Sequence, residues 1–174
     1  MKRSLLLLVL TSTVCAAGQR GVPPSEGIAN FGKVNDGLYR GAQPKAAGIA
    51  TLARLGIKTI INLRTTNDVW KAEEAQARAQ GITYTNVPLK GLGRPTRAQV
   101  AALLALIQTL PPPVFVHCEH GCDRTGTIIA CYRIRHDGWP DEAALEEARK
   151  YGLSKLERGM TDFVRSFGKP PAKQ

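Results

Sequence analysis

The sequence predicts a single α/β domain with one central, mostly parallel sheet flanked by helices. Short β-branched apolar runs alternate with Ala- and Leu-rich stretches at helical spacing, and Gly or Pro residues separate most of them. Continuously apolar strands are typical of parallel strands buried on both faces, and alternation with helices is the pattern that joins such strands into one sheet. A chain of 174 residues has room for one such domain with a proper core.

The first half of the expected domain places two helices around its most apolar strand. LYRGAQP, residues 38–44, joins a short apolar piece to a turn, and Pro44 suits the first turn of a helix that ends at Gly56. The next run, IKTIINL at 57–63, is β-branched and apolar at its centre, as expected for a buried strand. An Ala- and Glu-rich helix over 68–80 follows.

The second half repeats the alternation of strand and helix. ITYTNVPL, residues 82–89, alternates polar and apolar residues like a strand, and Thr96 can cap an Ala- and Leu-rich helix over 97–109. VFVH, residues 114–117, is a short buried strand. Further helices are expected over 126–136, 141–150 and 154–167.

The N-terminus resembles a secretory signal peptide. It has a positive start at Lys2 and Arg3, an apolar stretch too short to span a membrane, and small residues for cleavage. We therefore expect an exported protein, periplasmic or secreted, and no other segment is apolar over the length that a transmembrane helix needs. The expected division of the chain is a signal peptide over 1–17, a flexible lead-in over 18–30, a folded domain over 31–168 and a polar tail over 169–174.

Charge and cysteine content restrict the chemistry. The chain has 24 basic and 14 acidic side chains and a net charge of +10, which favours anionic partners. Aromatic residues are sparse and no basic tract carries them at intervals, so nucleic acid is not an expected partner. Cys118, Cys122 and Cys131 remain after the signal peptide and do not resemble a disulfide framework, which indicates a thiol kept for chemistry.

The run VFVHCEHGCDRTGT leads from the last strand into a helix through a tight loop, residues 118–124. Ligands of open α/β sheets bind beyond the carboxyl ends of strands, and a loop that winds into a helix N-terminus turns its N–H groups inward. Such a loop can cradle a phosphate, and Arg124 adds a guanidinium that can hold two of its oxygens. A helix N-terminus and a nearby cation also favour the thiolate form of a cysteine. We therefore expect Cys118, at the mouth of the loop, to attack a bound phosphoryl group.

HCEHGCDRTG resembles the H-C-x5-R-[ST]-G signature loop of cysteine-dependent protein tyrosine phosphatases and dual-specificity phosphatases. LYRGAQP, IKTIINLR and YRIRHDGWPDEAALEE resemble, in order and spacing, the compact branch that contains small bacterial and atypical plant and fungal members. The resemblance covers roughly residues 31–155, and it implies that the domain over 31–168 is dual-specificity phosphatase-like, uses no cofactor and forms a phosphocysteine on Cys118. It implies that Thr125 assists breakdown of this intermediate. The phosphate-binding residues that it implies are Glu119, His120, Gly121, Cys122, Asp123 and Arg124.

The general acid of such enzymes is usually an aspartate on a separate loop before the signature strand. That loop should lie within NVPLKGLGRPTR, residues 86–97, which contains no acidic residue. Myotubularin-type phosphatases carry an acid at the place that Asp123 occupies, so the resemblance makes Asp123 the first candidate. Asp68, after the end of an earlier strand, is the second candidate, and Glu119 or water alone are the others.

Two other interpretations of the same loop compete with a phosphate site. His117, Cys118, His120 and Cys122 are potential metal ligands, but they lie too close together on a tight turn to converge on one tetrahedral ion, so no metal is expected. Cys122 is a candidate resolving thiol that would protect Cys118 through a reversible disulfide, and an incidental loop position fits it equally well.

The substrate class stays open between phosphorylated proteins and phosphorylated inositols or lipids. A rhodanese-like sulfurtransferase also uses a cysteine in an anion-binding loop, but the span from Cys118 to Arg124 followed by Thr-Gly favours the phosphatase. Outside the enzymes, the alternatives are a phosphate-binding module that has lost its acid and a redox or metal protein. The sequence predicts no particular oligomeric state.

Overall fold

Five short strands form one sheet in the order β1-β2-β5-β3-β4 in the computed structural model, which describes residues 21–169. Strand β1 runs antiparallel to β2, and the other neighbouring strands are parallel. The strands are β1 (Gly32–Asn35), β2 (Leu38–Gly41), β3 (Thr59–Asn62), β4 (Thr83–Asn86) and β5 (Val114–His117). The expected mostly parallel sheet is confirmed, and the antiparallel edge strand β1 is an addition that the sequence did not predict.

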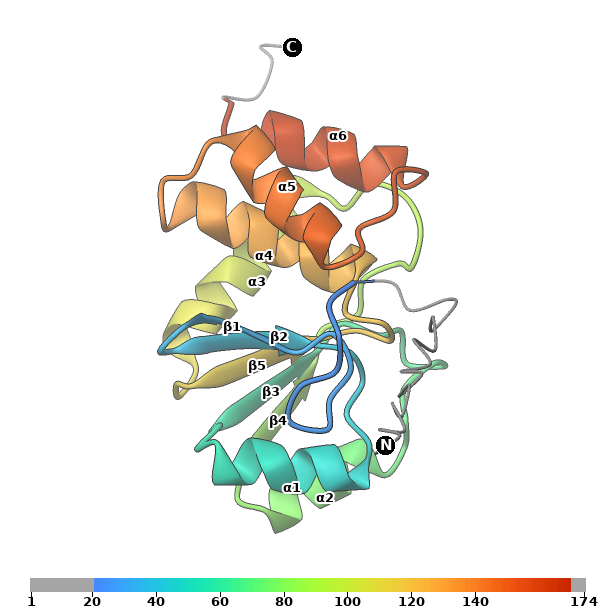
Figure 1. Ribbon diagram of the computed structural model, residues 1–174, viewed down its shortest axis with the longest axis vertical. Coiled ribbons are helices and arrows are strands. Elements are labelled where there is room, and N and C mark those ends of the chain that lie inside the picture. Colours follow the sequence, from blue (N-terminus) through green and yellow to red (C-terminus); the bar gives the residue numbers. More distant parts are fainter. Residues whose placement is uncertain (1–20, 170–174) are drawn as a thin grey trace, which may run out of the picture.

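Helices cover both faces of this sheet (Figure 1). The pair α1 and α2 covers one face, α3 and α4 cover the other, and α5 and α6 pack on the outer side of α4. The helices are α1 (Ala46–Arg54), α2 (Glu73–Ala79), α3 (Arg97–Thr109), α4 (Asp123–Arg135), α5 (Asp141–Lys150) and α6 (Arg158–Phe167). Helix α4, which begins in the signature loop, is thus enclosed between the sheet and two helices.

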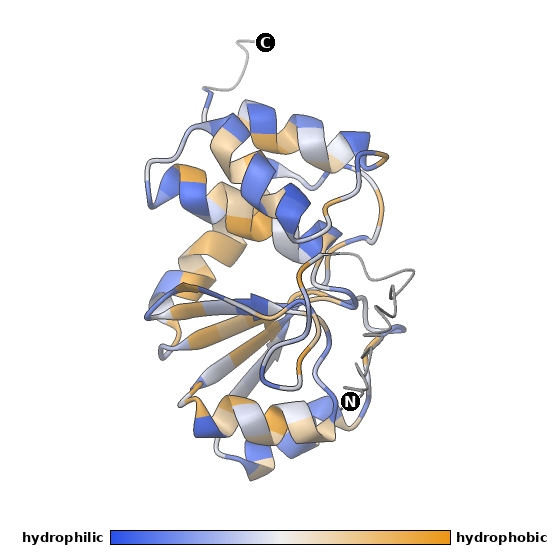
Figure 2. Ribbon diagram, viewed as in Figure 1, coloured by the Kyte–Doolittle hydropathy of each residue, from blue (hydrophilic) through white to orange (hydrophobic). Residues whose placement is uncertain are grey.

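The apolar core is divided by the sheet into two clusters. In β5, Val114 and Val116 belong to the cluster on the α3 and α4 face, together with Ile128. Phe115, between them, belongs to the cluster on the other face, together with Ile49. Successive residues of a strand point to opposite faces, so a continuously apolar strand feeds both clusters. Figure 2 shows the resulting apolar colouring on the strands and on α4.

Several expected elements are confirmed with shorter bounds. The strands expected over 57–63 and 82–89 are confined to β3 and β4, and the helix expected over 154–167 begins at Arg158. The helix expected over 97–109 has those bounds, and Thr96 closes its N-terminus in a capping box with Gln99. This reciprocal pairing satisfies two amide groups that the first helical turn leaves without partners.

The expected helix over 68–80 begins five residues later than predicted, at Glu73. Its first part is instead a turn, in which the Asp68 amide donates to the Thr65 carbonyl at 2.8 Å. The Asp68 carboxylate is held by Arg64 through two hydrogen bonds, of 2.6 and 3.2 Å. This side-chain pairing holds the segment in a turn that helical periodicity alone does not reveal.

The expected helix over 126–136 begins three residues earlier than predicted, at Asp123. Arg124 and Thr125 are therefore part of the first turn of α4 rather than of the loop before it. A guanidinium in this position is carried by a rigid helix, which fixes its direction relative to the loop.

The expectation that residues 18–30 form a flexible lead-in is wrong for residues 28–30. Ile28 and Asn30 are each 1% exposed, and the Ala29 carbonyl accepts a hydrogen bond from the Ala42 amide at 2.9 Å. Ile28 fills the cluster beneath α1, and Asn30 reaches the signature loop, so the folded part begins before residue 31. The predicted signal peptide over 1–17 lies outside the described residues, as does most of the tail.

Candidate active site

The signature loop leaves the sheet at its centre. In the parallel register, Gly41 of β2 and Asn62 of β3 are both paired with His117, the last residue of β5. Three carboxyl ends therefore meet at one edge, and the loops that follow them surround Cys118. This is the position at which open α/β sheets bind their ligands.

Four consecutive carbonyl groups of the loop are held by donors from surrounding segments or from the preceding residue. The bonds are His117 Nδ1 to Cys118 O at 3.1 Å, Gln43 N to Glu119 O at 3.0 Å, Asn30 Nδ2 to His120 O at 3.1 Å and Arg40 Nη2 to Gly121 O at 2.9 Å. In a trans peptide the carbonyl and the following N–H point in opposite directions. The amides of residues 119–122 are therefore turned away from these donors, toward the inside of the loop. An inward-facing set of amides is what an anion-binding loop requires.

Gly121 makes the tight approach of this loop possible. Its φ is +70°, and a Cβ built on it would lie 2.5 Å from both the carbonyl carbon and the carbonyl oxygen of Gly41. A side chain at position 121 would therefore be strained by its backbone and would collide with the end of β2. The position therefore suits only glycine, and the expected phosphate-binding role of Gly121 stays a prediction.

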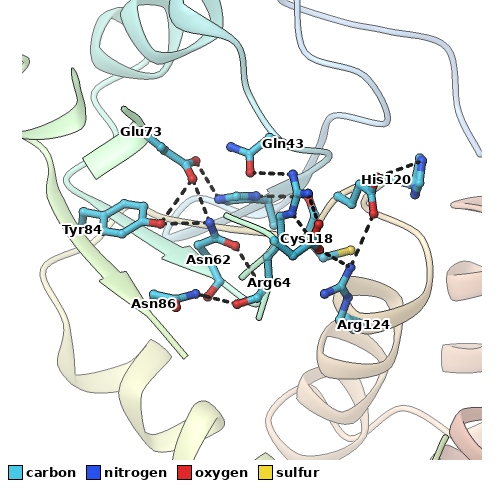
Figure 3. A network of polar contacts seen from close by, with 12 residues as sticks. Gln43, Asn62, Arg64, Glu73, Tyr84, Asn86, Cys118, His120 and Arg124 are labelled. Carbon is cyan, nitrogen blue, oxygen red and sulfur yellow. Dashed lines mark hydrogen bonds and ion pairs between the residues drawn. The ribbon is translucent and has the colours of Figure 1, made fainter. Parts of the chain in front are cut away.

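Cys118 and Arg124 are brought together, as the sequence predicts. Cys118 is 3% exposed and Arg124 is 8% exposed. Figure 3 shows the Arg124 guanidinium beside the Cys118 sulfur. Arg124 Nη2 also lies 4.0 Å from a carboxylate oxygen of Glu119 and 3.9 Å from one of Asp68. The arginine thus lies near both the thiol and two carboxylates. In this position its N–H groups would donate hydrogen bonds to the oxygens of a bound phosphate.

A buried polar network supports the residue that precedes the nucleophile. His117 and Glu73 are fully buried, and His117 Nε2 lies 2.9 Å from Glu73 Oε1. The other carboxylate oxygen of Glu73 accepts from Asn62 Nδ2 at 2.8 Å and from the Tyr84 hydroxyl at 3.3 Å (Figure 3). Burial, followed by the charge of Glu73, raises the pKa of Tyr84 to about 12, so the phenol stays a donor. Because a carbonyl oxygen only accepts, His117 Nδ1 is the donor to Cys118 O, while Nε2 and Glu73 Oε1 lie close together without hydrogen-bond geometry.

The candidate acids lie in different environments. Asp123 Oδ1 accepts from the Ser154 amide at 2.9 Å, so this carboxylate faces the segment between α5 and α6. Asp68 and Glu119 face Arg124 instead, at the distances given above. The hydrogen bond from Arg64, more than any other contact, holds the pKa of Asp68 below its usual range. Arg64 is itself steadied by Gln43 Oε1 at 3.3 Å.

The remaining predicted site residues differ in how they are placed. The Thr125 hydroxyl is buried and has no hydrogen-bond partner within residues 21–169, and its role in breakdown of the intermediate stays a prediction. The His120 side chain is 68% exposed at the rim. The Cys122 thiol donates to the His120 carbonyl at 3.3 Å and accepts from Asn30 Nδ2 at 3.5 Å. Cys122 is thus engaged on the Asn30 side of the loop, and its redox role stays a prediction.

Sequence reasoning missed the residues that hold the loop from outside. Arg40, Asn30 and Glu73 are each no more than 1% exposed, although charged and amide side chains are usually exposed. One signal was present: Arg40 is the charged residue of the short strand-like piece LYRG. Asn30 and Glu73 carried no comparable signal, because a polar lead-in and an Ala/Glu helix are ordinary surface features.

The described part of the chain has neither a metal-ligand cluster nor a membrane-spanning helix. Within residues 21–169, no group of three or more His, Cys, Asp or Glu side chains is arranged to hold a metal ion. No helix in the same range is both long enough and apolar enough to cross a membrane.

Comparison with known proteins agrees with this geometry. The family described as "DSP-PTPase phosphatase fused to NAD+ Kinase" matches residues 23–166. The dual specificity protein phosphatase TpbA of Pseudomonas aeruginosa PAO1 is 34% identical over 164 residues, which are 88% of this chain and 68% of that protein. For TpbA of strain UCBPP-PA14 the match spans 66% of the protein. The inositol diphosphatase DSP3 of Arabidopsis thaliana is 29% identical over 83% of this chain and 71% of its own length.

Solved structures have the same fold. The crystal structure of P. aeruginosa TpbA superposes with a TM-score of 0.71 at 30% identity, over 86% of this chain and 91% of the other. The core catalytic domain of the phosphatase SIW14 from S. cerevisiae superposes with a TM-score of 0.72 at 23% identity, over 84% and 88% of the two chains, and this likeness concerns the fold alone. Sequence match, fold and loop agree: the chain belongs to the dual-specificity branch of the cysteine-dependent phosphatases.

Proposed function

We propose that this chain hydrolyses phosphoric monoesters on phosphorylated proteins through a phosphocysteine intermediate. The observation that carries the proposal is the loop whose four outward carbonyls turn the amides of residues 119–122 inward, with Arg124 beside Cys118. The Cys118 thiolate attacks phosphorus, the bond to the ester oxygen breaks, and that oxygen leaves with a proton. Water then attacks the phosphocysteine, which releases inorganic phosphate and restores the thiolate. The loop amides and Arg124 hold the three non-bridging oxygens throughout.

Phosphate release from a panel of substrates tests this proposal. The panel contains p-nitrophenyl phosphate, phosphotyrosine and phosphothreonine peptides, phosphoinositides and inositol polyphosphates, under reducing conditions. Turnover is expected for the wild type and is expected to vanish in Cys118→Ser, while that variant still binds phosphopeptide. Binding without release by the wild type, even from the activated aryl ester, would indicate a phosphate-binding module. Release of thiocyanate from thiosulfate and cyanide would indicate a sulfurtransferase instead.

A second candidate function is hydrolysis of a phosphoanhydride on a phosphorylated inositol. The segment 86–97, where an acid is usual, contains none. An acid matters most when the leaving oxygen is strongly basic, and a phosphate leaving group needs far less protonation than a serine or threonine alkoxide. The net charge of +10 and the similarity to a plant inositol diphosphatase favour the same substrate class. A higher kcat/KM on inositol diphosphates than on phosphopeptides would select this function.

The general acid is tested on the same panel. Asp123→Asn, Asp68→Asn and Glu119→Gln are compared on a phosphotyrosine and a phosphothreonine substrate. Loss of the acid is expected to lower kcat on the poorer leaving group by about 10²-fold or more and to affect an activated aryl ester much less. Asp123 accepts a hydrogen bond from the Ser154 amide, whereas Asp68 faces Arg124. The comparison of these two variants therefore decides which of the two carboxylates donates the proton. An equal loss on every substrate would mean that the residue shapes the loop rather than donating a proton.

We also propose that the protein is exported. The support is the sequence of residues 1–17, with its positive start, short apolar stretch and small residues before Gly18. Expression of the full chain in a bacterial host, fractionation and N-terminal sequencing test this. A processed chain that begins near Gly18 outside the cytoplasm is expected, and an unprocessed cytoplasmic chain would contradict it.

A further inference from the structure

Arg40 is a fully buried cation directly behind the signature loop. It is the third residue of β2 and is 1% exposed. Its Nη2 donates to the Gly121 carbonyl at 2.9 Å, and its guanidinium carbon lies 3.8 Å from the centre of the Tyr151 ring. Its Nε and Nη1 are buried without a hydrogen-bond partner within residues 21–169. Burial lowers the pKa of Arg40 to about 10, so the side chain is still charged at neutral pH.

Arg40 has no carboxylate partner that would explain its burial. Within the described range, no Asp or Glu oxygen lies within 4.0 Å of its guanidinium. The acidic groups that do interact with it electrostatically are Tyr151, Glu147, Cys118 and Cys122. Burying an arginine is costly unless a negative charge compensates it. The inside of the loop, where a thiolate and a phosphate dianion would both lie, offers a place for such a charge, because Arg40 contacts the loop from behind at the Gly121 carbonyl.

We propose that Arg40 is a positioning residue of the phosphatase site, which acts on Cys118 and on bound phosphate from behind the loop. It does so in two ways. It holds the Gly121 carbonyl outward, which turns the amide of residue 122 inward, and it places a second positive charge, besides that of Arg124, behind the loop. The inference rests on the proposed function, because it assigns this charge to the same thiolate and the same phosphate.

The chain offers a matched control that separates charge from geometry. Asn30 holds the preceding carbonyl, His120 O, at 3.1 Å, is also 1% exposed, and carries no charge. Its φ of 53° is a conformation that glycine adopts freely, so Asn30→Gly removes the side chain without backbone strain. Arg97 provides the second control, because its guanidinium donates to the Phe167 carbonyl at 3.1 Å at the end of α6, away from the loop.

The experiment compares Arg40→Met, Arg40→Lys, Asn30→Gly and Arg97→Met in the full chain. The first readout is the pH at which inactivation by iodoacetamide, protected by phosphate, reaches half of its maximal rate. The second is the inhibition constant of vanadate, a phosphate analogue. In Arg40→Met we expect the midpoint to rise by about one pH unit and vanadate binding to weaken about tenfold, the effect of losing one nearby charge. In Arg40→Lys we expect most of the shift to be restored.

The control variants show whether the shift in Arg40→Met comes from the lost charge or from a changed loop geometry. Arg97→Met is expected to lower the urea midpoint of unfolding and to leave the pH midpoint unchanged. Asn30→Gly is expected to weaken vanadate binding and to move the pH midpoint less than Arg40→Met does. Equal shifts in Arg40→Met and Asn30→Gly, or an Arg40→Lys variant as impaired as Arg40→Met, would overturn the role of the charge.

Two further outcomes remain informative. If Arg40→Met does not fold, Arg40→Lys decides, because a pH midpoint displaced by a full unit despite the retained charge contradicts the proposal. Failure of the proposed function is seen separately: a wild type that binds vanadate and is alkylated at Cys118 but releases no phosphate would refute hydrolysis and leave the role of Arg40 measurable.

Discussion

The buried carboxylate of Glu73 should be among the most sensitive positions outside the signature loop. It is fully buried, its Oε2 accepts from Asn62 Nδ2 at 2.8 Å and from the Tyr84 hydroxyl at 3.3 Å, and its Oε1 lies 2.9 Å from His117 Nε2. Glu73→Gln keeps the shape but replaces one acceptor oxygen by an NH2 group. An NH2 group at the Oε2 position would face the Asn62 and Tyr84 donors, and in either orientation of the amide the negative charge beside His117 is lost.

The expected loss of stability follows from these contacts. An unsatisfied buried donor costs about 1–3 kcal/mol, and breaking a buried ion pair by removing one charge costs about 3–5 kcal/mol. Because these two contributions overlap at Glu73, we expect a loss of about 3–4 kcal/mol in the free energy of unfolding. With a urea m-value of about 2 kcal/mol per molar, the midpoint of unfolding should fall by roughly 1.5–2 M.

Urea denaturation followed by circular dichroism measures this loss, and the neighbouring glutamate is the control. Glu74 pairs with Arg78 at 2.8 Å on the exposed side of α2, and its side chain is 52% exposed. Such surface pairs contribute well under about 1 kcal/mol, so Glu74→Gln should shift the midpoint little. A loss below about 1 kcal/mol in Glu73→Gln would refute the reasoning, because it would mean that the His117 contact carries no charge pairing.

Three further outcomes follow from particular contacts. Gly121→Ala should lose vanadate binding and at least about 2 kcal/mol of stability in urea, because its Cβ would meet the Gly41 carbonyl at 2.5 Å at a positive φ; unchanged binding would contradict the fit of the loop against β2. Thr96→Ala should lose about 1 kcal/mol through its capping box while kcat stays unchanged; a fall in kcat would show that the loop before α3 takes part in turnover. The pKa of Asp68 is lowered by Arg64, so its pairing stabilises the fold above pH ~4 and is lost as the pH falls through the lowered value. The difference in urea midpoint between wild type and Asp68→Asn should therefore be constant from about pH 7 to 5 and shrink below about pH 4, and a difference that grows there would be the wrong sign.

Interactions between residues close in the chain explain why several strands, several helices and the signature loop can be predicted from the sequence. A strand such as β5 is recognisable because Val114, Phe115 and Val116 are consecutive apolar residues, as is typical of a short strand buried on both faces. Helix α3 is recognisable because Thr96 and Gln99 are three residues apart, which is the spacing of a capping box. The signature loop is recognisable because thiol, glycine, arginine and helix start follow one another within a few residues. Each of these features is formed by residues that are close together in the chain, so each one is visible in the sequence.

The tertiary structure alone decided what holds that loop in place and how the candidate acids are arranged around it. Asn30 and Arg40 contact the loop across 90 and 81 residues of chain, and Glu73 of α2 meets His117 of β5 only in the folded chain. The first candidate acid, Asp123, turned to Ser154, 31 residues away, while Asp68 came to Arg124 through a turn that interrupts an expected helix. Contacts of this kind leave no periodicity and no motif in the chain, because the burial of a polar side chain depends on what packs over it.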